Sequence, residues 1–147
     1  MNKNSLVLKM FLLLFPLFMI SCEKESLITE DKLPAKISEF LQTHFEGKKV
    51  LQVLKDKELV STSHVVLLEG NVRLDFDGKD DIEEIESSSK LPDSVIPIKL
   101  LDYVQANLPS SFVIGWEKED KNQEIQLNTG EKIEFNMDGV FLRFDFD

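Results

Sequence analysis

The chain carries one sequence pattern twice, and this repeat constrains its fold more than any other feature. The segment LPAKISEFLQTHF at residues 33–45 aligns with IPIKLLDYVQANL at residues 96–108. In both copies an apolar residue precedes a proline, and apolar residues then recur at the spacing of one helical face. Proline suits the first turn of a helix, where its missing N–H is not needed. Each half of the chain is therefore predicted to begin with an amphipathic helix.

Four segments with the character of β-strands follow each predicted helix. The aligned pairs are VLQVLKD (50–56) with VIGWEKE (113–119), HVVLLEG (64–70) with EIQLNTG (124–130), and NVRLDFD (71–77) with EKIEFN (131–136), before last strands that begin near Ile82 and Val140. In the second copy Ile125 and Leu127 alternate with polar residues, which is typical of a strand with one buried face. A four-stranded unit is small for independent stability, so the two sheets are expected to join or pack together.

The first 21 residues are predicted to be a signal peptide. Lys3 and Lys9 flank the apolar run MFLLLFPLFMI at residues 10–20, which is followed by a serine and Cys22. A basic start, an apolar segment of about 7–15 residues and a small residue before the cut describe a secretory signal. The run is shorter than the roughly 20 residues of a membrane-spanning helix, and Pro16 interrupts it.

Cys22 is predicted to carry a lipid anchor. It is the only cysteine and follows MIS directly, which resembles the lipobox of bacterial lipoproteins, although Met19 stands where leucine is usual. An ordinary signal with a chance cysteine is the alternative. The next residues, EKE at 23–25, resemble the tag that sends some Gram-negative lipoproteins to the outer face of the outer membrane, unless they are only a solvated tether. The predicted location is the outer membrane, on its periplasmic side or at the cell surface.

The mature chain is predicted to be strongly acidic. Removing the signal takes away two of the 17 basic residues and none of the 27 acidic ones, which lowers the formal net charge from −10 to −12. Such a surface repels nucleic acid and anionic lipid, so no nucleic-acid partner is expected. Contact with the membrane is expected through the lipid anchor only.

The acidic stretch LDFDGKDDIEEIE at residues 74–86 raises the question of a calcium site. Its DGKDD aligns with the Asp-Gly turn of the second copy, and neither Asp75 nor Asp77 opens a register with the ligands and glycine of a helix-loop-helix calcium loop. We therefore interpret the stretch as a turn between two strands and predict no metal site. Loose calcium binding by Asp77, Asp80 and Asp81 remains an alternative.

The doubled pattern resembles the PepSY-like family of secreted bacterial proteins, whose fold is related to the β-lactamase inhibitor protein. It covers residues 33–147, and its recurring features are the apolar-Pro helix, the hairpin that ends in LLEG or LNTG, and the LDFD or IEFN strand. The resemblance implies an α+β fold of two tandem helix-plus-four-strand units, with the helices on one face of a continuous antiparallel sheet. It also implies a non-enzymatic binding or inhibitory role, with the other sheet face available to a partner.

The expected organisation follows from these segments. It comprises a signal peptide (1–21), a lipidated N-terminus and tether (22–32), a first repeat (33–86), a linker (87–95) and a second repeat (96–147).

No catalytic motif is found in the sequence. Only His44 and His64 could act as a histidine base, and they align with Asn107 near a helix end and Glu124 at a strand start. The sequence has no G-x-S-x-G, Walker loop or H-E-x-x-H motif. We therefore expect no enzymatic activity and no cofactor.

A partner-binding face is predicted on the sheet. Val66 and Leu68 align with positions that are polar in the second copy, and the chain's two arginines, Arg73 and Arg143, fall on strands. Phe141 and Arg143 alternate away from a predicted core run, which consists of Leu142, Phe144 and Phe146. Apolar side chains and arginine on an open face suit an interaction surface. The alternative is that residues 66 and 68 are covered by the hairpin at 57–63 or by a neighbouring strand.

Trp116 is the only tryptophan, and core packing is favoured over a recognition role because it aligns with Val53. The leading hypothesis is a lipid-anchored envelope protein that binds an unidentified envelope or secreted protein or peptide. The alternatives are a calcium or small-ligand binder at the acidic turn and a structural subunit of a surface assembly.

Overall fold

The computed structural model describes residues 26–57 and 61–145, which form two helices, two short 3-10 helices and one sheet. β1 (Ser26–Ile28) and η2 (Glu30–Lys32) precede the first repeat, which contains α2 (Ala35–His44), β2 (Val50–Lys57), β3 (Thr62–Leu68), β4 (Val72–Phe76) and β5 (Ile82–Ser87). After η3 (Asp93–Val95) in the linker, the second repeat contains α3 (Ile98–Asn107), β6 (Val113–Lys118), β7 (Asn122–Leu127), β8 (Lys132–Asn136) and β9 (Phe141–Asp145).

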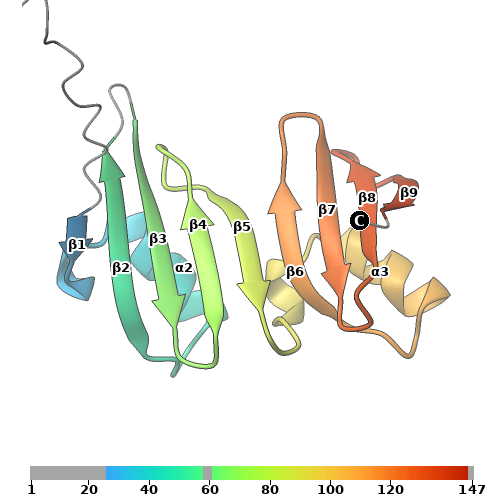
Figure 1. Cartoon of the computed structure of the whole chain (residues 1–147), viewed down its shortest axis with the longest axis horizontal. Coiled ribbons are helices and arrows are strands. Elements are labelled where there is room, and N and C mark those ends of the chain that lie inside the picture. The colour runs from blue at the N-terminus through green and yellow to red at the C-terminus, as the bar shows by residue number, and fades with distance from the viewer. Residues whose placement is uncertain (1–25, 58–60, 146–147) are drawn as a thin grey trace, which may run out of the picture.

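All nine strands belong to one antiparallel sheet, and their order in space follows their order in the chain. Figure 1 shows α2 and α3 on the same side of this sheet, so no helix of the described residues covers the opposite side, which we call the open face. The predicted fold, two helix-plus-four-strand units in one continuous sheet, is confirmed. One strand was not predicted: Ser26–Ile28, in the expected tether, pairs with β2 as an extra edge strand.

The two helices begin where the sequence indicates. Pro34 and Pro97 precede the first helical residues, and their carbonyl oxygens accept the N–H groups of Ser38 and Leu101 at 3.0 and 3.1 Å. The proline nitrogen has no hydrogen to leave unsatisfied at this position. Neither helix in the described part of the chain is long and apolar enough to cross a membrane.

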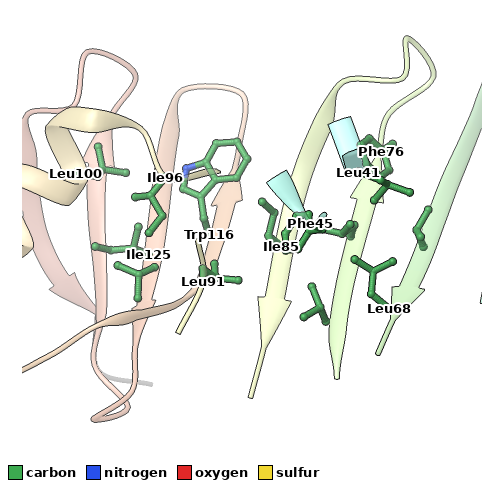
Figure 2. Packing of buried hydrophobic residues seen from close by; sticks show 14 of the residues in the cluster. Leu41, Phe45, Leu68, Phe76, Ile85, Leu91, Ile96, Leu100, Trp116 and Ile125 are labelled. Atoms are coloured by element: carbon green, nitrogen blue, oxygen red, sulfur yellow. The ribbon is translucent and has the colours of Figure 1, made fainter. Parts of the chain in front are cut away.

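One hydrophobic core runs through both repeats between the helices and the sheet. It joins Ile37 and Leu41 of α2 with Leu100 and Val104 of α3 and with the inward side chains of the strands. Figure 2 shows residues of both repeats in this layer, and Trp116 is among them. Trp116 is 8% exposed, which confirms the prediction of core packing.

The linker between the repeats is packed rather than extended into solvent. Leu91 and Ile96 are buried, and the Leu91 N–H donates to the Val113 carbonyl at 2.9 Å. On either side of the linker, β5 pairs with β6, so the two repeats share backbone hydrogen bonds. The open face is therefore one surface that extends across both repeats.

Candidate binding face

A patch of apolar side chains lies on the open face at its N-terminal edge. Cross-strand pairing places Leu27 opposite Leu54, and Leu54 opposite Val65. Leu67 lies two residues further along β3, on the same face as Val65. Leu27 is 70% exposed, and the other three side chains are half-buried. We call Leu27, Leu54, Val65 and Leu67 the apolar patch.

A hollow of about 490 Å³ lies over the apolar patch. Leu54, Val65 and Leu67 form its apolar lining, while Arg73 and Asp75 lie at one side. Arg73 Nη2 is 2.6 Å from Asp75 Oδ2, so the arginine is oriented by a carboxylate on its own strand. The hollow combines apolar surface with charged groups, as partner-binding surfaces do.

Beyond the apolar patch, one cross-strand row continues as carboxylates. Each member of the row lies directly opposite the next on the neighbouring strand. The five residues, on β4 to β8, are Asp75, Glu84, Glu117, Glu124 and Glu134. We call them the acidic row. Arg143 on β9 follows Glu134 and ends the row.

Three members of the acidic row have a cationic neighbour. Arg73 pairs with Asp75, Lys132 Nζ lies 3.0 Å from Glu124 Oε1, and Arg143 contacts Glu134. Within residues 26–57 and 61–145 no ion pair joins Glu84 or Glu117 to a cation. Like charges directly opposite each other on a sheet are destabilising. The middle of the row is therefore a place where the fold retains unfavourable charge.

The environment raises the pKa of two carboxyls in the acidic row. Burial is the main cause of the raised pKa of Glu84, and the negative charges of Glu86, Asp75 and Glu117 add to it. Burial also raises the pKa of Asp75, although Arg73 opposes the shift. Both shifts mean that the ionised form is disfavoured relative to a carboxylate in water.

The prediction that Val66 and Leu68 lie on the partner-binding face is wrong. Both lie on the helix-facing side and are 0% and 2% exposed. The sequence alignment matched Gly70 with Gly130, whereas in space Asn71 is the counterpart of Gly130. Asn71 and Gly130 both have positive φ, at 57° and 99°. The residue after Asn71 is Val72, which pairs with Leu68, and the residue after Gly130 is Glu131, whose carbonyl accepts the N–H of Leu127. The one-residue shift exchanges the two faces of β3.

Phe141 is also a correction. It was expected on the open face, but it stacks on Tyr103 of α3 with ring centroids 5.1 Å apart and planes 5° apart. A register shift between β8 and β9 lets Phe141 and Phe144 both face the helices, while Leu142 is 46% exposed rather than in the core. A bulge of this kind adds one residue and interrupts the alternation. Phe146, the third residue of that predicted run, lies outside the described residues.

Arg73 and Arg143 lie on the open face, as expected from the sequence. Arg73 is opposite Leu67 and Glu86, and Arg143 is opposite Glu134. The sequence analysis did not place Leu54, Val65 and Leu67 on the open face. The alternation of apolar and polar residues in β2 and β3 could have indicated them, but alternation identifies a face only when the register of the turn is known.

The carboxylates of the acidic turn do not converge on one point. Asp77 Oδ1 accepts the N–H groups of Lys79 and Asp81 at 2.8 Å, and Asp81 Oδ1 is 2.6 Å from Lys36 Nζ. Asp80 lies beside His64, and Asp75 is on the open face. In the part of the chain that the structure describes, no group of three His, Cys, Asp or Glu side chains is arranged to hold a metal ion.

The two histidines have structural neighbours. His44 Nδ1 is 3.0 Å from Ser94 Oγ, which joins the end of α2 to the linker. No carboxylate within the described ranges forms an ion pair with His44, so the geometry of a catalytic triad is not completed there. His64 is buried, with Nδ1 3.4 Å from Asp80 Oδ1.

The sequence matches the family described as "Putative beta-lactamase-inhibitor-like, PepSY-like" over residues 18–80 and again over residues 61–143. These matches span most of the chain, and the protein belongs to this family. No curated protein matches the sequence.

Solved structures from Bacteroides share this fold. A putative periplasmic protein of unknown function from Bacteroides vulgatus is 27% identical with a TM-score of 0.77, and covers 84% of this chain and 100% of its own. A second putative periplasmic protein from that organism is 25% identical with a TM-score of 0.79, covering 85% and 99%. A putative calcium-regulated periplasmic protein from Bacteroides thetaiotaomicron is 23% identical with a TM-score of 0.78, covering 83% and 97%.

Proposed function

We propose that this protein is a non-enzymatic, lipid-anchored protein of the cell envelope that binds a protein or peptide through the open face of its sheet. The observation that carries the proposal is the apolar patch, whose side chains are exposed or half-buried on the face that the helices do not cover. Apolar surface bordered by charged groups is typical of interaction sites. The periplasmic descriptions of the solved relatives agree with an envelope location.

The lipid anchor is assigned to Cys22, which lies outside the described residues. Its support is the sequence alone, namely the basic start, the apolar run and the MIS that precedes the cysteine. Two acyl chains on one residue hold a protein stably to a membrane. Cys22→Ser is therefore expected to move the protein from the membrane fraction to the soluble fraction after cell lysis. Retention of the variant in the membrane fraction would contradict lipidation.

Binding is tested by affinity purification of the tagged full-length chain from its host. Leu54→Thr, Val65→Thr and Leu67→Thr together remove most of the apolar patch while retaining residues that favour strands. The control variant carries Leu51→Thr, Ile98→Thr and Val140→Thr, which are exposed apolar side chains outside the patch. The native and control chains are expected to retain one defined protein that the patch variant loses. Equal retention by all three chains would overturn the proposal.

Two other functions stay open to direct tests. Calcium binding by the turn at 75–81 would raise the melting temperature in about millimolar calcium, because a ligand of the folded state stabilises it. The description of one relative as calcium-regulated motivates this test, but at 23% identity that likeness concerns the fold. A structural subunit of a surface assembly would purify in a permanent complex, whereas a regulatory partner would exchange.

A further inference from the structure

A small hollow opens on the open face at Gly115, where the two repeats meet. It measures about 40 Å³, and four glutamates surround it: Glu84, Glu86, Glu117 and Glu124. Gly115 creates the space, because a Cβ there would lie 3.2 Å from Gln126 Cβ. Each molecule in liquid water takes up about 30 Å³, so a hollow of about 40 Å³ has room for one small polar group.

The charges around this hollow are only partly compensated. Lys132 lines it and pairs with Glu124, and Glu86 lies 3.9 Å from Arg73. Glu84 and Glu117 have no ion pair within residues 26–57 and 61–145, as described above. A cation placed between them would offset their mutual repulsion, which adds to the effect of burial in raising the pKa of Glu84.

We propose that the partner presents a basic segment to the acidic row, with the ammonium group of one lysine side chain in the hollow at Gly115. This inference rests on the proposed function and names the chemistry of the partner. The cross-strand row that contains the five carboxylates begins with Leu27, Leu54 and Val65. The complementary segment is therefore apolar at one end and basic along the rest of its length.

The spacing of the acidic row fits a helix that lies across the strands. Neighbouring strands are about 4.8 Å apart, and one helical turn rises about 5.4 Å. Over the four intervals between five carboxylates, the mismatch is about 2.4 Å, which flexible lysine side chains span. Alternate residues of an extended strand repeat at roughly 6.7 Å, so their mismatch accumulates to about 8 Å. The bound segment is thus a helix with a basic residue on each turn.

An anionic membrane is the less favourable occupant of this face. The acidic row places five carboxylates on adjacent strands, and the protein as a whole has a formal net charge of −10. Like charge would repel anionic lipid headgroups. A protein segment that is apolar at one end and basic along the rest complements both the apolar patch and the acidic row.

The test measures binding of a synthetic peptide to the mature chain in nonionic detergent. The peptide is a helix with leucines on its first turns and one lysine on each later turn along the same face. A second peptide of equal composition distributes the lysines around the helix. Fluorescence anisotropy gives the dissociation constants at low and high salt, because ionic contacts weaken as salt rises.

The test variant is Glu84→Gln with Glu117→Gln, and the control is Glu39→Gln with Glu46→Gln. Both remove two negative charges, but Glu39 and Glu46 are exposed on and after α2, away from the open face. The patterned peptide is expected to bind the native and control chains equally and the test variant about fivefold more weakly at low salt. Its preference over the distributed peptide is also expected only with the native and control chains.

Equal binding to all three chains would overturn the inference. So would binding of the Cys22→Ser chain, which has no lipid anchor, to anionic vesicles in detergent-free buffer without binding to the peptide. The cellular purification separates this failure from that of the proposed function. If the test variant still retains the native partner, the basic segment is wrong and the binding face stands. If the native chain retains no partner that depends on the apolar patch, the binding face itself is wrong.

Discussion

His64 and Gln123 occupy equivalent positions in the two repeats, and both are buried polar residues. Gln123 is satisfied: its Oε1 accepts from Trp116 Nε1 at 3.3 Å, and its Nε2 donates to the Asn136 carbonyl at 3.1 Å. His64 Nδ1 forms no hydrogen bond within the described residues. Burial lowers the pKa of His64 and Lys55 lowers it further, while Asp80 raises it. The equivalent buried position therefore holds a titratable side chain, His64, in the first repeat and an uncharged one, Gln123, in the second.

His64 is expected to make the protein less stable in acid. Since its pKa is lower in the folded state, the unfolded chain takes up the proton first as pH falls below 6.5, and stability is lost through the folded pKa. His64→Gln, which copies the second repeat, removes this loss. Urea unfolding at about pH 7.5 and about pH 5 should show a smaller decrease in the free energy of unfolding for His64→Gln than for the native chain.

His44→Gln is the control for this measurement, since His44 lies outside the core on the helix and contacts Ser94. It should leave the difference between the two pH values unchanged. A His64→Gln chain that loses as much stability in acid as the native chain would contradict the role given to burial.

A single turn residue also determines which face of β3 is buried. The helices and strands follow from periodicity, but the face of β3 depends on which turn residue has positive φ. In the second repeat that residue is Gly130, whereas in the first both Gly70 and Asn71 have positive φ. Asparagine tolerates this conformation better than most residues, so the glycine alone did not indicate the register.

The two faces of β3 lie in different environments. Val66 is fully buried in the core, while its neighbour Val65 is half-buried on the open face. A threonine hydroxyl at residue 66 would have to be buried, whereas at residue 65 it can reach water. Val66→Thr is expected to lower the free energy of unfolding by about 1–3 kcal/mol, and Val65→Thr by less than about 0.5 kcal/mol.

Urea unfolding of these two variants therefore tests the register directly, because the substitutions are chemically identical. A larger loss at residue 65 than at residue 66 would mean that β3 is turned over. It would also restore the sequence-based assignment of Val66 and Leu68 to the open face.

The acidic row should be costly to the free protein. Removing the charge of Glu84 relieves its repulsion with Asp75 and Glu117, which lie directly opposite it. Glu84→Gln is expected to raise the free energy of unfolding at neutral pH by about 0.2–1 kcal/mol. The gain should disappear in acid, where the native carboxyl is protonated. A destabilised variant at neutral pH would contradict this account of the row.

In the last strand, β9, the alternation of apolar residues does not predict which side chains are buried. Leu142, Phe144 and Phe146 alternate as a core face would, yet Phe141 rather than Leu142 packs against α3. The bulge that causes this is a property of the pairing between β8 and β9. The sequence of β9 alone does not indicate this bulge. The fold could therefore be predicted from the sequence, but the side chains of β9 that lie on the open face could not.

Over the whole molecule, the repeat predicted the architecture and the open face follows from it. In the described residues two helices cover one side of nine strands, and the other side changes from apolar on β1 to β3 to acidic on β4 to β8. Cys22 lies four residues before β1, a distance of at most about 14 Å in an extended chain. A lipid anchor at Cys22 would therefore hold the apolar end of the face next to the membrane, where a partner of the envelope can reach it.

Photo-crosslinking in the native host tests the open face most directly. A photoreactive amino acid replaces Leu67 in one full-length chain and Ile98, an exposed residue of α3, in another. We expect a crosslinked adduct with one defined protein from residue 67 and none from residue 98. An adduct from residue 98 alone would place the partner on the helical side of the sheet and would rule out binding through the open face.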